Sequence, residues 1–148
     1  SVTKINTDSR NRFVSNIESK IKLGSTICLW GLSFKPDTDD IREAPSVYII
    51  KSLLSKGYKL NVYDPASQDN IKKIFHSQLN YFNDQYTALE GCDALCILTE
   101  WNQFEEADFD KMKKGLKNNI IFDGRNIYDP KKMKELGFNY YCVGRKTL

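Results

Sequence analysis

The sequence predicts an α/β fold: a three-layer αβα, doubly wound and mostly parallel sheet of the Rossmann-like type, preceded by an N-terminal helix. Short apolar segments alternate with helical segments of about ten residues, which is typical of βαβ crossover units. Residues 93–99 (DALCILT) are almost continuously apolar, as in a parallel strand buried on both faces. With 148 residues, the chain is long enough for one such domain with its own core.

An N-terminal helix is predicted from a stripe of apolar residues. Phe13, Ile17 and Ile21 recur every four residues with Val14 beside them, and Gly24 leads into the first strand. The strands are expected at apolar segments bounded by glycine or turn residues: 25–31, 59–64, 79–82, 93–99, 118–124 and 138–144, the last at an edge of the sheet.

Helices are expected between these strands. The first has the clearest boundaries, because Pro45 fits a first turn and Gly57 fits the C-terminal end, with apolar residues from Val47 to Leu54 on one face. The expected helices cover residues 44–57, 67–76, 84–91, 107–117 and 130–137.

The charge distribution argues against nucleic acid as a partner. The chain carries 22 Lys and Arg against 19 Asp and Glu, a net charge of +3, and residues 1–22 alone account for this excess. The rest of the chain is therefore neutral and lacks the basic stripe of a nucleic-acid-binding domain. No apolar segment approaches the roughly 18 residues that span a membrane, so no membrane contact is expected either.

Ligands of open α/β sheets bind beyond the carboxyl ends of the strands, so the loops at 32–44, 99–104 and 123–130 are the expected functional region. The first turn has a single glycine, Gly31, in place of the G-x-G-x-x-G pattern that admits a pyrophosphate. The domain is therefore not expected to be a conventional NAD site. Asp64 stands where a ribose-binding carboxylate would, although Asp-Pro is more typical of a turn or cap.

The loop after the first strand holds two cations. Lys35 offers a compact charge and Arg42 a bidentate fork, and both suit phosphate or carboxylate groups. Asp37, Asp39 and Asp40 are expected to cap turns and to hold these cations in fixed directions. No metal site is predicted, because the acidic residues lack further ligands at suitable spacing. A solvated charged segment without a binding role is the alternative.

A third cation, Arg125, follows the buried strand at 118–124, after a glycine that allows a close approach. It is a second candidate for binding an anion. The alternative is a structural ion pair with Asp123 or Asp129.

The other reactive residues favour binding over catalysis. Trp101 either stacks on a ligand or belongs to the core. His76, the single histidine, falls in a helix away from the candidate loops, and no nucleophile stands next to a base, so no catalytic residue is predicted. The four cysteines lack C-x-x-C spacing and stand in apolar surroundings, which indicates reduced thiols in a cytoplasmic protein: Cys28, Cys92, Cys96 and Cys142.

Four segments resemble, in the same order, signatures of the C-terminal domain of the UDP-glucose/GDP-mannose dehydrogenase family. They are GLSFKPDTDDIREAPS, GYKLNVYDP, ALEGCDALCILTEWNQF and FDGRNIYDP, and the resemblance covers essentially the whole chain. TEWNQF and DGRNIYDP are most similar to the members that act on UDP-glucose. The resemblance implies a UDP-sugar-binding domain of an enzyme that oxidises UDP-glucose twice to UDP-glucuronate with two NAD⁺. UDP-N-acetylhexosamine or GDP-mannose as substrate, and a non-catalytic nucleotide-binding scaffold, are the alternatives.

The resemblance also implies roles for single residues. Phe34, Lys35 and Arg125 would contact the UDP-sugar, with Lys35 on the sugar side, and Arg42 would reach the NAD. NAD itself would be bound mainly by an N-terminal domain of the same protein, and the full-length protein would form a homodimer. Residues 1–22 would be the tail of an inter-domain linking helix, and residues 23–148 the UDP-sugar-binding domain.

One departure from the family concerns the reaction itself. The family's cysteine nucleophile lies in a Gly-x-Cys-x-Pro-Lys-Asp-type motif, and none of the four cysteines of this chain stands in such a motif. The resemblance therefore implies a fragment that is inactive alone.

Overall fold

The computed structural model describes residues 2–144, with side chains described from residue 8 onward. The helices are α1 (Val2–Lys20), α2 (Pro45–Ser55), α3 (Gln68–Phe75), α4 (Gln85–Leu89), α5 (Asn102–Glu105), α6 (Phe109–Gly115) and α7 (Pro130–Glu135), with a 3-10 helix η1 (His76–Gln78). The strands are β1 (Thr26–Trp30), β2 (Lys59–Tyr63), β3 (Asn80–Tyr81), β4 (Ala94–Ile97), β5 (Ile120–Asp123) and β6 (Asn139–Cys142).

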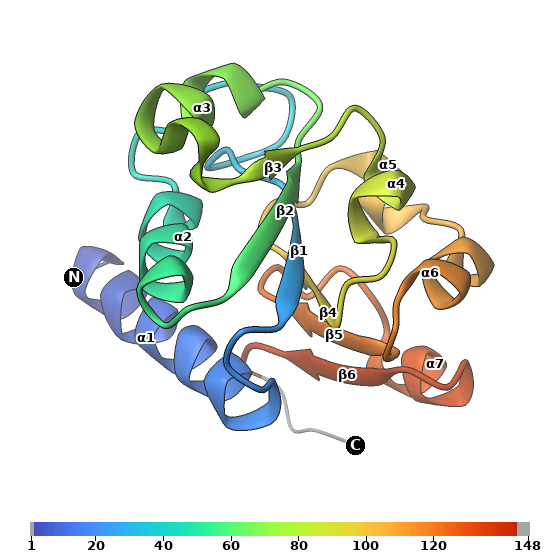
Figure 1. Cartoon of the computed structure of the whole chain (residues 1–148). Helices are drawn as coiled ribbons and strands as arrows, with labels where there is room; N and C mark the ends of the chain where they lie inside the picture. The colour runs from blue at the N-terminus through green and yellow to red at the C-terminus, as the bar shows by residue number, and fades with distance from the viewer. Residues whose placement is uncertain (1, 145–148) are drawn as a thin grey trace.

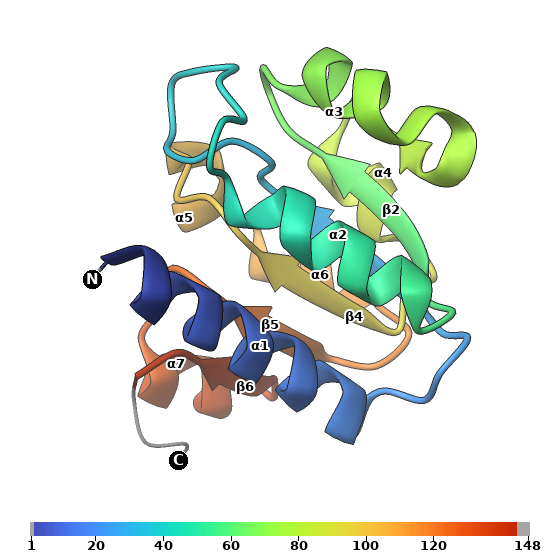
Figure 2. The ribbon, with the colours of Figure 1, turned by 90° about the vertical axis from the view of Figure 1, so that its left-hand side faces the viewer.

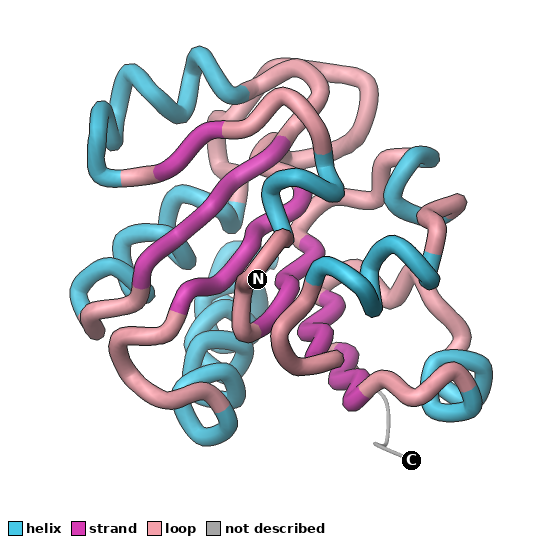
Figure 3. The backbone as a smooth tube through the Cα atoms, turned by 45° about the vertical axis from the view of Figure 1, so that its right-hand side comes forward, coloured by secondary structure: helices cyan, strands magenta, loops and turns pink. Residues whose placement is uncertain are grey.

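The strands form one sheet in the order β3-β2-β1-β4-β5-β6, and every neighbouring pair is parallel (Figures 1 and 3). The predicted fold class is confirmed, and the sheet is parallel throughout its described strands. β6 lies at an edge, as expected. Two short elements were not predicted: α5 overlaps the expected loop at 99–104 and ends at Glu105, and η1 follows α3.

Helices cover both faces of the sheet. α1, α2 and α3 pack on one face, and α4, α5, α6 and α7 pack on the other (Figure 2). Alternate residues of β1 point to opposite faces of the sheet. Ile27 and Leu29 pack on the side of α1–α3, whereas Cys28 and Trp30 pack on the side of α4–α7. This period of two along fully buried strands explains why the strands read as continuous apolar segments.

The N-terminal helix is part of the same core. Phe13, Val14 and Ile17 of α1, and Ile21 directly after it, are all buried in the same core layer as α2 and the sheet, as their spacing predicts. The Tyr58 hydroxyl, at the start of β2, donates to the Ile21 carbonyl at 2.6 Å. The division of the chain at residue 23 stays a prediction, and residue 1 and residues 145–148 lie outside the described part.

The sequence predicts reduced thiols in apolar surroundings and no membrane-spanning segment. Cys28, Cys92 and Cys96 are buried free thiols, and Cys142 is half-buried. Burial raises the pKa of the Cys96 thiol far above its ordinary value, which makes that sulfur unreactive. Of the helices within residues 2–144, none is both long and apolar enough to cross a bilayer.

The strand order changes direction at β1. The chain moves from β1 outward to β2 and β3, and then returns past β1 to β4, β5 and β6. The helices that follow β1 and β4 therefore lie on opposite faces of the sheet, and open α/β sheets bind ligands beyond the carboxyl ends of the strands at such a point.

Candidate functional site

Loops from β1 and β4 are in contact from their first residues. Gly31 follows β1 with a φ of +94°, and a Cβ there would lie 2.6 Å from the Cβ of Thr99. The Thr99 hydroxyl donates to the Ser33 carbonyl at 2.8 Å. Thr99 thus fills the space beside Gly31 that a pyrophosphate would need.

The buried carboxylate of Asp64 fixes the start of the loop after β1, at Leu32. This start of the loop is called its root. The carboxylate accepts hydrogen bonds from the backbone N–H of Leu32 at 2.7 Å and of Ala66 and Ser67 at 2.8 Å each. The Ser46 hydroxyl donates to the Leu32 carbonyl at 2.5 Å. The interpretation of Asp64 as a turn residue is confirmed, whereas the N-cap of α3 is Ser67.

Beyond this root the loop exposes its functional candidates. Phe34 is 47% exposed and Lys35 is also exposed. Arg42 forks onto Asp40, with Nε 3.0 Å from Oδ1 and Nη2 2.8 Å from Oδ2. These hydrogen bonds from Arg42 lower the pKa of the Asp40 carboxyl to about 2. The prediction that an acidic residue directs Arg42 is confirmed, whereas Lys35 has no ion-pair partner among the described residues.

The loop after β5 is organised by Asp123, which is fully buried. Its carboxylate accepts from the backbone N–H of Arg125 at 2.9 Å, of Ile127 at 2.8 Å and of Tyr128 at 3.3 Å. It also accepts from the Tyr140 hydroxyl at 2.5 Å. Burial, and then the charge of Asp123, raise the pKa of Tyr140 well above its ordinary value, so this hydroxyl remains a donor.

The Arg125 side chain pairs with Glu100 at the end of β4. Its Nη2 lies 2.6 Å and its Nε 3.1 Å from Glu100 Oε2, and both side chains are about one third exposed, at 33% and 30%. The expected alternative partners, Asp123 and Asp129, are therefore wrong: Asp123 binds the backbone of Arg125, and Asp129 caps α7 through Lys132 N–H. The loops after β4 and β5 are joined by this ion pair.

The candidate residues line two neighbouring hollows. The first, the α1 groove, has a volume of about 370 Å³ and is lined by residues of α1, α2 and the edge loops: Ser9, Arg10, Phe13, Phe34, Pro45, Ile49, Leu98, Gly124, Arg125 and Val143. The second, the lysine hollow, has about 460 Å³ and is lined by Phe34, Lys35, Thr38, Asp40, Arg42 and Glu43. Phe34 borders both, so Lys35 and Arg125 lie at one edge of the sheet but in adjacent hollows.

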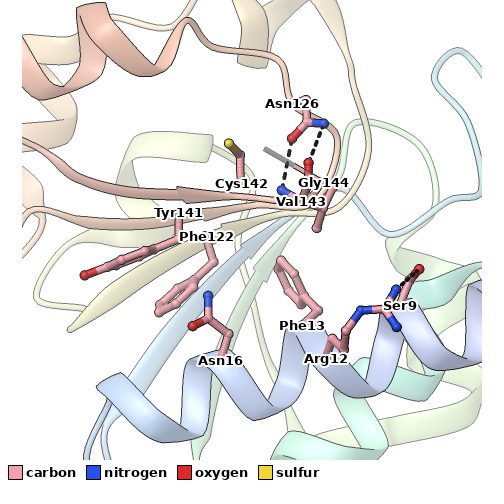
Figure 4. A pocket seen from close by; sticks show the side chains of 10 residues that line it. All are labelled: Ser9, Arg12, Phe13, Asn16, Phe122, Asn126, Tyr141, Cys142, Val143 and Gly144. Carbon is pink, nitrogen blue, oxygen red and sulfur yellow. Dashed lines mark hydrogen bonds between the residues drawn. The ribbon is translucent and has the colours of Figure 1, made fainter. Parts of the chain in front are cut away.

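A further hollow of about 530 Å³ lies between α1 and β6, beside the α1 groove (Figure 4). Arg12 and Asn16 enter it from α1, and Tyr141 lines it from the sheet. The Asn126 side chain, which follows Arg125, exchanges two hydrogen bonds with the backbone of Val143 at its rim. None of the residues predicted to bind ligand lines this hollow.

The remaining candidates fall outside the hollows. Trp101 packs against the core layer of α4–α7, which supports its interpretation as a core residue. His76 is exposed. Among the described residues, no three His, Cys, Asp or Glu side chains gather at metal-binding distance.

Sequence reasoning missed Arg10 and Glu100 as neighbours of the predicted cations. Arg10 stands one helical turn before Phe13 and Val14, so the period of α1 places it beside the buried stripe, and that signal was present in the sequence. Glu100 offers no comparable signal, because its pairing with Arg125 depends on how β4 and β5 align.

Comparison with known proteins now adds to this geometry. A sequence model described as the UDP-binding domain of the UDP-glucose/GDP-mannose dehydrogenase family matches residues 28–130. The chain belongs to this family. Both edge loops that carry the candidate cations, from Phe34 to Arg125, lie within the matched segment of this UDP-glucose/GDP-mannose dehydrogenase family domain.

Two curated relatives illustrate the match. UDP-glucose 6-dehydrogenase of Pseudomonas aeruginosa is 41% identical over 127 residues, which cover 82% of this chain and 28% of that protein. UDP-glucose 6-dehydrogenase YwqF of Bacillus subtilis is 35% identical over 150 residues, which cover 100% of this chain and 34% of that protein. The chain thus spans about one third or less of the relatives that it matches.

Solved structures share the fold. A UDP-glucose dehydrogenase from Pyrobaculum islandicum aligns with a TM-score of 0.78 and 26% identity, over 93% of this chain and 30% of that one. A GDP-mannose dehydrogenase from Pseudomonas aeruginosa aligns with a TM-score of 0.65 and 27% identity, over 81% of this chain and 28% of that one. Family members named for different sugars therefore share this architecture.

Proposed function

We propose that this chain is the UDP-sugar-binding domain of an NAD-dependent UDP-glucose 6-dehydrogenase. The complete enzyme converts UDP-glucose, two NAD⁺ and water into UDP-glucuronate and two NADH. The relatives named UDP-glucose 6-dehydrogenase, at 35–41% identity, support UDP-glucose as the substrate.

The observation that carries this proposal is the arrangement of Phe34, Lys35 and Arg125. They lie around two adjacent hollows at the carboxyl edge of a parallel sheet. An aromatic ring flanked by an ammonium and a guanidinium suits an anionic nucleotide sugar, because the cations meet the phosphates and the ring packs on the flat or apolar parts. Lys35, which has no carboxylate partner among the described residues, is placed on the sugar side, where its charge stabilises negative charge that develops on the sugar oxygen.

NAD is assigned mainly to an N-terminal domain of the same protein. The turn after β1 does not fit the pyrophosphate of a dinucleotide, because Thr99 occupies the space beside Gly31. Arg42 is the residue of this chain assigned to the cofactor: its side chain is 87% exposed, and its fork already binds an anionic group, the Asp40 carboxylate. The residues of this chain bind and orient, and the cysteine nucleophile belongs to another part of the enzyme.

A titration of the ¹⁵N-labelled chain with UDP tests the binding proposal. Half of an inter-domain site is expected to supply about −4 to −5 kcal/mol, which corresponds to a Kd near the millimolar range. We expect the largest amide shifts at residues 34–42 and 123–126. Shifts confined to other parts of the chain, or none at millimolar UDP, would reject this site.

Two further measurements separate the alternatives. The purified chain is expected to produce no NADH from UDP-glucose and NAD⁺, and NADH production would overturn the assignment of the nucleophile and the cofactor to other parts of the enzyme. Protection against thermal unfolding by UDP but not by GDP would exclude both a GDP-mannose enzyme and a scaffold that binds no nucleotide. In the complete enzyme, a homodimer by resemblance, turnover of UDP-glucose against UDP-N-acetylmannosamine decides the sugar.

A further inference from the structure

The α1 groove is flanked by two arginines that lie far apart in the sequence. Arg10 enters it from α1 and Arg125 enters it from the loop after β5, while Phe13 and Leu98 are among the apolar residues that line it. Its volume of about 370 Å³ lies within the range of small-molecule sites. Two guanidinium groups beside an apolar lining suit a ligand that combines an anionic group with an apolar or flat body.

The two arginines differ in how their charge is balanced. Arg125 is neutralised by Glu100 at 2.6 Å, as Arg42 is by Asp40 at 2.8 Å. Arg10, in contrast, has no carboxylate within ion-pair distance among the described residues. The uncompensated positive charge of the groove therefore comes from Arg10, on the helix, and not from the arginine of the loop.

Arg10 also has hydrogen-bonding capacity that the protein leaves unused. Its Nη2 donates to the Glu43 carbonyl at a long 3.4 Å, and its guanidinium carbon lies over the Tyr48 ring, 5.9 Å from the ring centroid. Its Nε–H is buried and has no acceptor among the described residues. A guanidinium carries five N–H donors, and buried donors in native proteins are rarely left unpaired.

Glu100, which holds Arg125, does not itself line the groove. Its Oε1 is buried without a hydrogen-bond partner among the described residues, but a carboxylate oxygen only accepts hydrogen bonds and gains none from a phosphate. The unused capacity that an anionic ligand can meet is therefore the buried Nε–H donor of Arg10.

We propose that Arg10 is a ligand-binding residue of the α1 groove, and that a phosphate group of the ligand lies between the guanidinium groups of Arg10 and Arg125. This inference rests on the proposed function and adds to it a residue of α1. The nucleotide then connects the N-terminal helix with the loop after β5, with the ring of Phe34 as the wall toward Lys35.

Binding of UDP and of uridine to Arg10→Gln tests the proposal, with Arg12→Gln as the matched control. Arg12 carries the same charge on the same helix but lines the neighbouring hollow, where it donates to Ser9 Oγ at 3.2 Å (Figure 4). We expect Arg10→Gln to weaken UDP binding by about tenfold, since a charge-assisted hydrogen bond is lost, and to leave uridine binding unchanged. Arg12→Gln should change the affinity for UDP and for uridine by no more than about twofold, because Arg12 lines the other hollow and its exposed charge is screened by solvent.

The outcomes separate this inference from the function on which it rests. If UDP shifts the amides at 34–42 and 123–126 but Arg10→Gln binds UDP like the wild type, the role of Arg10 is refuted and the UDP site stands. If the wild-type chain does not respond to UDP, both fail. In case Arg10→Gln does not fold, the Nε–H resonance of Arg10 in the wild-type chain gives an independent result. It should shift on addition of UDP and not of uridine, and a resonance that stays in place would refute the contact.

Discussion

The loop after β1 and the loop after β5 both carry a cation predicted to bind substrate, but they are supported differently. Asp123 binds three backbone N–H groups of the second loop from within the core. The first loop is held at its root by Asp64, whereas beyond the root its contacts are mostly internal, such as those between Asp40 and Arg42. Arg125 is therefore presented by a rigid support, and Lys35 by a segment that can adjust to its ligand.

The difference has a functional meaning. A preorganised cation costs little ordering entropy when the ligand binds, so Arg125 suits the invariant phosphate part of a nucleotide sugar. Under the proposed function, an adjustable loop suits the part of the site that would contact the sugar and the cofactor, to which Lys35 and Arg42 are assigned. Asp37 and Glu43, both non-glycine residues with φ of +64° and +59°, lie within the loop that follows Lys35.

The largest effect is expected from Asp123→Ala. The substitution leaves three backbone donors and the Tyr140 hydroxyl without their acceptor, so it should lower the free energy of unfolding by about 4 kcal/mol, as measured by urea denaturation. Asp40→Ala is the control, because Asp40 bonds only within its own loop, and its urea midpoint should stay close to wild type. Equal losses for the two variants would remove the distinction between the loops.

The second prediction has a smaller expected effect and concerns the close contact between Gly31, after β1, and Thr99, after β4. Gly31→Ala and Gly57→Ala both place a side chain at a φ near +90°, but a Cβ at Gly31 would lie 2.7 Å from the backbone N of Thr99, whereas nothing lies within 4 Å at Gly57. We expect a loss of about 3 kcal/mol for Gly31→Ala and about 1 kcal/mol for Gly57→Ala, measured by thermal and urea unfolding. Similar losses would mean that Thr99 moves away at little cost.

The sequence predicted the sheet because each strand carries its own signal. Buried parallel strands such as β4 are apolar along their whole length, and the stripe through Phe13 and Ile17 marks α1, so these elements depend on local residues alone. α5 was missed because four residues are too few to show a period, and its N-cap position, Trp101, makes no side-chain capping hydrogen bond.

The site was predictable in its positions but not in its contacts. Lys35, Arg42 and Arg125 follow strand ends, and parallel strands bring such ends to one edge. Glu100 and Arg125 are 25 positions apart, and their pairing depends on the alignment of β4 and β5, which no local pattern encodes.

Substitution of Lys35, the cation of the loop after β1, should impair catalysis without affecting the stability of the fold. In the complete dehydrogenase, Lys35→Ala should lower kcat/KM for UDP-glucose by about a hundredfold, because charge on the reacting sugar oxygen loses its counter-charge. Lys51→Ala, an exposed lysine of α2, is the control and should leave kcat/KM unchanged. Turnover of Lys35→Ala at the wild-type rate would place Lys35 outside the site.

The smallest expected effect concerns the ion pair between Arg42 and Asp40 in the loop after β1. The fork from Arg42 lowers the pKa of Asp40 from 3.8 to about 2, so the carboxylate form is favoured in the folded state. The associated stability is present above about pH 4 and is lost as the pH falls toward 2, and it is small because both groups are exposed to solvent. A ¹³C titration of the carboxyl groups should find the pKa of Asp40 at about 2 in the wild type and higher in Arg42→Gln, where the hydrogen bond from the backbone N–H of residue 42 remains and still lowers it. If the pKa of Asp40 is the same in both proteins, the bidentate pair of Arg42 with Asp40 is not formed in solution. The loop that carries Lys35 would then be less ordered than its internal contacts indicate.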